Sequence, residues 1–212
     1  LELVPGALEG IKGKFYEETH DLSGNKGIGA ISAGQEQPIC LNSRFGRLAI
    51  VTNGWIDNAE ALAKGLLDRG HSFSEVRRGQ INQTELVAKL INEGRTIVDG
   101  IENVFKCIDG SCSMLILTGE GIYAARDRIG HFPLVLGCGP NGYAITSETA
   151  AFTNLDYKVE KYLGAGEVLL INENGCEVKR GAEKKCKTCA FLWIYTGFPT
   201  STYEGINAEC VR

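Results

Sequence analysis

Three short hairpin signals follow one another in the second half of this sequence, and they restrict the fold more than any other feature. Apolar runs pair across the glycines of residues 119–121, across Asn141-Gly142 and across Asn174-Gly175. Asn-Gly is the strongest short hairpin signal, because both residues tolerate the positive φ angles of two-residue turns. Parallel strands need long crossover connections, so three successive hairpins imply antiparallel pairing. A doubly wound parallel sheet is therefore not expected.

Helical patterns in the first half supply a second layer. Asp57 with Glu60, and Asn82 with Glu85, have the spacing of a capping box, and each pair precedes apolar residues at helical spacing. A third short helix is expected over residues 99–105. Because hairpins need no crossover helices, these helices must cover sheet faces. The sequence predicts an α+β protein with stacked antiparallel sheets.

The stretch AIVTNGWIDNAEAL, residues 49–62, raises the first question about function. Residues 27–31 and 47–52 are both expected to form short buried strands, and the second of them runs into Asn53 and Gly54. One interpretation is a tight turn, since Asn and Gly adopt positive φ at little steric cost. The other is an oxyanion site, in which the Asn53 side-chain N–H and the Gly54 backbone N–H point at developing negative charge.

Composition narrows the class of protein. The chain has 212 residues, 43% hydrophobic and 23% charged, which suits a single globular domain over residues 1–212. A net charge of −4 without runs of Lys or Arg argues against nucleic acid or an anionic membrane surface as the main partner. A small-molecule or protein partner is expected, and a homo-oligomer stays open. The sequence has no bilayer-spanning stretch and no signal-peptide pattern, so a cytoplasmic location is expected.

The chain contains eight cysteines, most of which are expected to be small buried hydrophobes, Cys40 among them. Cys186 and Cys189 have CxxC spacing, which is compatible with half of a metal site or with a redox pair. A four-ligand zinc site needs two more ligands, and the three histidines are isolated in the sequence. We therefore predict no metal and no cofactor.

Seven segments, in order along the chain, resemble the glutaminase domain of class II glutamine amidotransferases. Among these enzymes, the similarity is greatest to the amidophosphoribosyltransferases. The segments are GNKGIGA (24–30), QEQP (35–38), TNG (52–54), ARDRIGHFPLVLG (125–137), ITSETAAF (145–152), GAGEVLLI (164–171) and CAFLWIYTGFPTSTYEGINAECVR (189–212).

This resemblance implies both a fold and a chemistry. The fold is the four-layer αββα sandwich of N-terminal-nucleophile hydrolases, with two stacked antiparallel sheets between helices. In the family, a cysteine at the mature N-terminus attacks the glutamine side-chain amide with its own α-amino group as base, and ammonia passes to a second domain. The resemblance gives Asn53 and Gly54 the role of oxyanion donors. The implied partners are glutamine or a related small molecule, and a phosphoribosyltransferase domain or chain.

Three departures from the family pattern bear on activity. Residue 1 is Leu, where the mechanism requires Cys. The segment between Gly29 and Gln35 lacks the arginine that grips the substrate carboxylate in the family. Gln83 stands where the family has an Asp that pairs with the substrate ammonium, so Gln83 is the predicted substrate-binding residue. Two hypotheses follow: a glutaminase domain whose cysteine lies upstream, or an inactive binding or assembly module of the same fold. The three departures together favour the module over a truncated enzyme.

Other residues of the resembling motifs receive structural interpretations. Arg126 and Asp127 are expected to pair with each other at a strand end. His131 is expected to have a structural role, and Trp55 to be a core or interface anchor. None of these four is predicted to take part in the chemistry.

Overall fold

In the computed structural model, residues 24–212 are described except for residues 33, 75, 78 and 154. The prediction that concerns residue 1 therefore lies outside the described residues.

The largest element is a six-stranded sheet in the order β1-β2-β5-β6-β10-β11, in which every neighbouring pair is antiparallel. Two of the predicted hairpins form its β5-β6 and β10-β11 pairs, so these predictions are confirmed. The strands are β1 (Ile39–Ser43), β2 (Gly46–Ile56), β5 (Gly110–Leu117), β6 (Ile122–Ala125), β10 (Val168–Asn172) and β11 (Gly175–Arg180).

A second antiparallel sheet contains three strands in the order β8-β7-β9. The predicted hairpin at Asn141-Gly142 joins β7 to β8 and is confirmed. The strands are β7 (Val135–Gly139), β8 (Gly142–Thr146) and β9 (Lys158–Tyr162), and two short ribbons pair β3 (Val76–Arg77) with β4 (Gln80–Ile81) and β12 (Thr202–Tyr203) with β13 (Ile206–Asn207).

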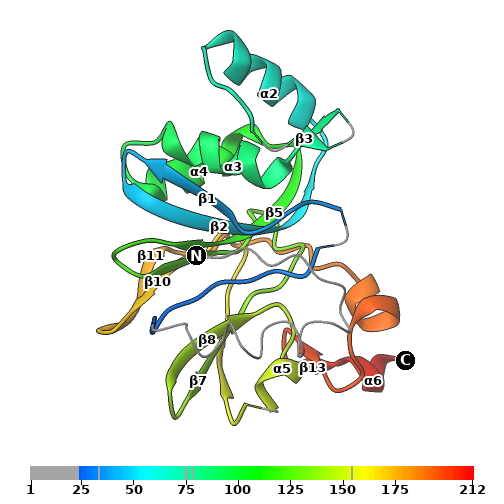
Figure 1. The fold of residues 1–212 in the computed structure, drawn as a ribbon. Coiled ribbons are helices and arrows are strands. Elements are labelled where there is room, and N and C mark those ends of the chain that lie inside the picture. The colour runs from blue at the N-terminus through cyan, green and yellow to red at the C-terminus, as the bar shows by residue number, and fades with distance from the viewer. Residues whose placement is uncertain (1–23, 33, 75, 78, 154) are drawn as a thin grey trace.

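Helices cover one face of the large sheet, and the small sheet packs on the other face (Figure 1). The larger core lies between α2, α3 and α4 and the sheet, and the smaller core lies between the two sheets. Phe152 of α5 packs against Gly137 on the small sheet. The helical segments are α2 (Ala59–Asp68), α3 (Gln83–Asn92), α4 (Ile97–Cys107), α5 (Ala150–Thr153), the π-helical turn η2 (Leu192–Thr196) and α6 (Ala208–Val211). The predicted α+β arrangement of stacked antiparallel sheets and covering helices is confirmed.

The two predicted helix starts differ in how they are capped. Asn82 caps α3 as predicted, because its side chain accepts hydrogen bonds from the backbone N–H groups of Thr84 and Glu85. The start of α2 differs from the prediction: its N-cap is Asn58 rather than Asp57, and it makes no side-chain capping bond. The Asn58 side chain instead bonds to the backbone of residues 107 and 109, which ties α2 to the end of α4.

Two further expectations are wrong. Residues 27–31 form no strand, and Ile31 is 78% exposed. A strand needs a neighbouring backbone, and none of the described segments pairs with these residues. Of the eight cysteines only Cys112 is buried, and Cys40 is exposed because it lies on the outward face of the edge strand β1.

Candidate functional site

Asn53 and Gly54 lie inside β2 rather than in a turn, because the strand continues to Ile56. The interpretation of these residues as a tight turn is therefore wrong. Gly54 has φ +152° and stands opposite Cys112 of β5, where a Cβ atom would overlap the carbonyl oxygen of Ser111. The glycine is required by the close approach of β5, not by a reversal of the chain.

Side-chain carboxamides replace a partner strand along one edge of β2. The Gln37 side chain accepts from the Thr52 N–H at 2.7 Å and donates to the Thr52 carbonyl at 3.1 Å. Four residues on, the Gln83 side chain accepts from the Ile56 N–H at 3.1 Å and donates to the Ile56 carbonyl at 3.3 Å. Each carboxamide thus binds both polar groups of one strand residue.

Gly54 lies midway between Thr52 and Ile56, the two residues that the glutamine side chains bind. Along a strand, alternate residues direct their N–H and C=O groups to the same edge, so Gly54 shares the edge of Thr52 and Ile56. Backbone pairing of β1 with β2 ends at Ile39 and Ile50, so no described backbone pairs with Gly54 on that edge. Gly54 is also exposed as a residue, and among the described residues its N–H has no partner on this edge.

Asn53 is exposed, and its side chain has no hydrogen-bond partner in the part of the chain that the structure describes. Its cross-strand neighbour is Ser113 of β5. The next residue on the same face of β2 is Trp55, which stands opposite Ser111 and is 61% exposed rather than anchored in the core. The amide of Asn53 therefore belongs to the residue next to Gly54, and no hydrogen bond among the described residues holds it.

A loop between the two sheets lies against the serines beside Asn53. The buried Asp127 carboxylate accepts from the backbone N–H groups of residues 129, 131 and 132 at 3.0 to 3.2 Å, and Ser113 Oγ lies 3.2 Å from it. Ser111 Oγ and His131 Nδ1 share a hydrogen bond of 3.1 Å. This loop fixes the position of His131 next to the polar face of β5.

Arg126 does not pair with Asp127, which corrects that prediction. Its guanidinium is buried and forms an ion pair of 2.6 Å with Glu204, and it donates to the carbonyls of Leu163 and Gly130. Asp127 is bonded to the backbone of its own loop and to Ser113 instead, so the two opposite charges have separate partners.

Gln83 lies close to the Asn53–Gly54 pair, but its carboxamide is already bonded to Ile56. A contact with a substrate ammonium would have to use the remaining lone pair of its carbonyl oxygen. Sequence reasoning placed Gln83 at the site and missed Gln37, although Gln37 belongs to one of the resembling segments. The contact between Gln37 and Thr52 spans fifteen residues and leaves no local pattern.

The thiol of Cys112, which stands opposite Gly54 on β5, is unsuited to nucleophilic attack. Burial raises the pKa of the Cys112 thiol to about 12, and the nearby negative charge of Asp127 adds to the effect. The reactive species of a cysteine is the thiolate, which Cys112 does not form near neutral pH. In the described residues, no three His, Cys, Asp or Glu side chains gather as a metal site, and the Cys186 thiol lies 3.2 Å from Thr188 Oγ1.

Comparison with known proteins identifies the class to which this fold and strand edge belong. Residues 27–154 match the glutamine amidotransferase domain family, and the chain is a member of that family. The amidophosphoribosyltransferases of Methanocaldococcus jannaschii and Bacillus subtilis are each 31% identical to it, over 83% and 91% of this chain. The chain spans 41% and 42% of the lengths of these two relatives.

Solved structures agree with this assignment. The allosteric regulatory enzyme of purine biosynthesis aligns with a TM-score of 0.74 and 30% identity, over 84% of this chain and 38% of its own. The B. subtilis glutamine phosphoribosylpyrophosphate amidotransferase, complexed with ADP and GMP, aligns with a TM-score of 0.73 and 30% identity, over 85% of this chain and 40% of its own. The predicted N-terminal-nucleophile sandwich is thereby confirmed.

In the part of the chain that the structure describes, no helix is long and apolar enough to cross a bilayer.

Proposed function

We propose that this chain is the glutamine-binding domain of an amidotransferase and that Asn53 and Gly54 hold the carboxamide of glutamine. The observation that carries the proposal is the Gly54 N–H, which has no partner among the described residues on the edge of β2 that Gln37 and Gln83 bind, next to the unbonded amide of Asn53. When a nucleophile attacks an amide carbon, negative charge develops on the carbonyl oxygen. Two N–H donors aimed at that oxygen stabilise the charge.

The proposed hydrolysis needs a thiolate that the buried Cys112 does not supply. The family mechanism uses an N-terminal cysteine with its own α-amino group as base. We therefore assign the attack to such a cysteine in the complete protein. Ammonia and enzyme-bound glutamyl thioester would form first, and water would then release glutamate and regenerate the thiol.

The charged end of glutamine is held less strongly in this proposal. Gln83 is neutral, and its carboxamide is bonded to Ile56. Residues 24–32 contain one cation, Lys26, and are exposed or half-buried. Hydrogen bonds to charged groups are about twice as strong as neutral ones, so a ligand ammonium loses part of its binding energy here. We expect a KM for glutamine higher than that of a relative with an Asp at this position.

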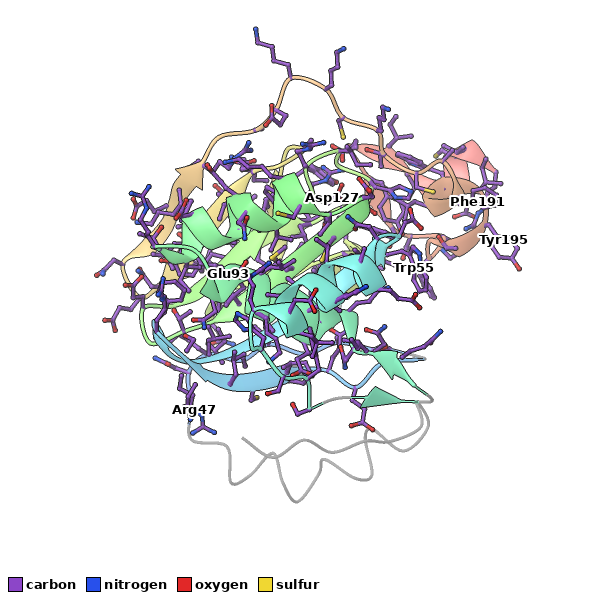
Figure 2. The ribbon with its side chains drawn as sticks, turned by 90° about the horizontal axis from the view of Figure 1, so that it is seen from above. Arg47, Trp55, Glu93, Asp127, Phe191 and Tyr195 are labelled. Carbon is purple, nitrogen blue, oxygen red and sulfur yellow. The ribbon has the colours of Figure 1, made fainter. Side chains whose placement is uncertain are left out.

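A partner that uses the ammonia is the second element of the proposal. Four large apolar side chains around η2, here called the η2 patch, are between 60% and 79% exposed: Phe191, Ile194, Tyr195 and Phe198. Figure 2 shows Phe191 and Tyr195 at the periphery of the molecule, directed away from the sheets. Exposed apolar clusters of this kind mark interaction surfaces. We assign the η2 patch to contact with a phosphoribosyltransferase domain or chain, because the relatives carry that activity in their name and are more than twice as long.

The alternative function is a glutamine-sensing or assembly module that binds without turnover. The commitment of Gln83 to Ile56 favours it, because that contact turns a family substrate group into part of the scaffold. This alternative keeps the fold and the Asn53–Gly54 edge but requires no nucleophile.

One experiment separates the two functions. The protein produced from its complete gene is incubated with glutamine and, separately, with a glutamine-like diazoketone. Glutamate release together with labelling of a cysteine establishes the hydrolase. Glutamine binding by calorimetry without release or labelling establishes the module. Absence of both binding and release refutes the proposal as a whole.

A further inference from the structure

We propose that Gln37 and Gln83 are positioning residues, which hold the edge of β2 so that Gly54 presents its N–H and C=O to a ligand carboxamide. The inference rests on the proposed function for the identity of the ligand. We call the contacts of the Gln37 and Gln83 side chains with β2 the braces, and their arrangement does not depend on the proposed function.

The first argument comes from the spacing of the braced residues. Thr52, Gly54 and Ile56 are consecutive on one strand edge, and the two outer residues each bind one primary carboxamide at both polar groups. A partner strand would cover all three residues, whereas two carboxamides cover only the outer two. The braces therefore hold Thr52 and Ile56 in place and leave Gly54, between them, uncovered.

The second argument is the backbone freedom of glycine. Gly54 has φ +152°, a region that glycine occupies readily but from which it also moves readily, since it has no Cβ atom to restrict it. Fixing the residues on both sides restricts that freedom. A donor that is already aimed stabilises a transition state without the cost of reorganisation.

The third argument is that the two segments that carry Gln37 and Gln83 are bonded to each other. The Gln83 backbone N–H donates to Gln35 Oε1 at 2.9 Å, and Asn82 Nδ2 donates to the Glu36 carbonyl at 2.9 Å. Thr52 Oγ1 lies 2.6 Å from Thr84 Oγ1. The start of α3, the segment before β1 and the end of β2 thus form one hydrogen-bonded frame around Gly54.

The frame also defines the chemistry of the ligand. Gly54 offers the same pair of groups, one N–H and one C=O, that Thr52 and Ile56 offer to the two glutamine side chains. A group that satisfies both must have a carbonyl oxygen and an N–H in one plane, as a primary carboxamide does. An ester or a carboxylate supplies only the acceptor and should bind less well.

The test uses Gln37→Met and Gln83→Met in the complete protein, with Gln80→Met at an exposed position as the matched control. Backbone hydrogen exchange of Thr52, Gly54 and Ile56 is the first measurement, because it does not depend on activity. We expect exchange at Thr52 to rise at least tenfold in Gln37→Met and at Ile56 in Gln83→Met. Gly54 should exchange rapidly in every protein. Unchanged exchange in both variants would overturn the proposal.

Glutamine kinetics give the second measurement. A misaimed donor lowers kcat, and losing one oxyanion donor outright costs about 100- to 1,000-fold. We expect each Met variant to lower kcat about tenfold or more, with KM within about threefold, and with an unfolding midpoint close to that of the parent protein. A raised KM with unchanged kcat in Gln83→Met would instead make Gln83 a substrate contact.

Gln83→Glu separates the two roles of Gln83. A carboxylate can accept from the Ile56 N–H but cannot donate to the Ile56 carbonyl, so a brace is weakened and kcat falls. A substrate contact would gain a charge for the ammonium, and KM would fall.

If the complete protein does not hydrolyse glutamine, the proposed hydrolase activity is refuted but the role of the braces is not. Hydrogen exchange still tests the braces, and a glutamine-induced NMR shift at Gly54 tests the ligand. Unchanged exchange overturns the role of the two glutamines, and absence of the shift at Gly54 overturns the assignment of the ligand.

Discussion

The braced edge of β2 and the preceding segment, residues 24–32, are built in opposite ways. The edge is fixed by side-chain hydrogen bonds from two elements and places Asn53 and Gly54 on a rigid sheet. Residues 24–32 form no strand or helix and are mostly exposed. In the proposed function, this edge of β2 binds the carboxamide of glutamine. In the family, the carboxylate of glutamine is bound by an arginine in the loop that corresponds to the segment between Gly29 and Gln35. In this proposal the scaffold recognises the amide of glutamine, whereas residues 24–32 provide no comparable scaffold for its charged end.

Gly54→Ala should have the largest effect, because a methyl group would overlap the Ser111 carbonyl and is also disfavoured at φ +152°. Such backbone strain costs about 1 to 3 kcal/mol, before the overlap is counted. We expect a loss of at least that size in the free energy of unfolding, measured in urea, and loss of glutamine binding.

Gly46→Ala is the matched control. Its φ is +88°, but open space surrounds the added methyl group. It should show the strain alone and leave glutamine binding intact. Equal destabilisation by the two variants would contradict the role assigned to β5.

Asn53→Ala should separate catalysis from stability. The side chain is exposed and has no partner among the described residues, so the free energy of unfolding should change by less than about 0.5 kcal/mol. In a hydrolytically active complete protein, kcat should fall about 100- to 1,000-fold. A change in stability without a change in kcat or in glutamine affinity would remove Asn53 from the site.

Cys112→Ala should change how stability depends on pH in the alkaline range. The folded-state pKa of this thiol, about 12, lies above its ordinary value of 9.0, so the folded state holds the proton more tightly. The associated stability is present below pH 9 and is lost as pH rises toward 12, at about 1.4 kcal/mol per pH unit. Urea unfolding followed from pH 8, below that window, to pH 11, inside it, should show a weaker pH dependence in the variant. Parallel curves would mean that Cys112 ionises normally.

Ile31→Ser should have the smallest effect. Ile31 is 78% exposed in the unpaired segment, so unfolding should change by less than about 0.5 kcal/mol. Glutamine KM should stay within about twofold. A large rise in KM would show that residues 24–32 do hold the substrate and would reverse the comparison between the two regions.

The sequence predicted those features that depend on neighbouring residues. The Asn-Gly turns and the Asn82 cap are local chemistry, and both are found as predicted. The strand expected over residues 27–31 failed because an apolar pattern does not specify a pairing partner. Cys40 failed similarly, since its exposure follows from the edge position of β1.

The candidate site could be predicted only in part. The resemblance placed Asn53, Gly54 and Gln83 in one region, but it did not supply the orientation of the Gln83 side chain. The contacts of Gln37 and Gln83 with β2 join residues 15 and 27 positions apart, and such contacts exist only once the chain has folded. The ion pair between Arg126 and Glu204 spans an even longer separation.

That ion pair has a consequence for how the molecule comes apart. Arg126 joins its own loop, at Gly130, to two distant stretches, at Leu163 and Glu204, and its side chain is buried. Detaching the last dozen residues would remove Glu204 and leave the buried guanidinium charge of Arg126 without its carboxylate partner. The C-terminal stretch should therefore not fray independently, and its proteolytic removal should proceed only through cooperative loss of the whole domain.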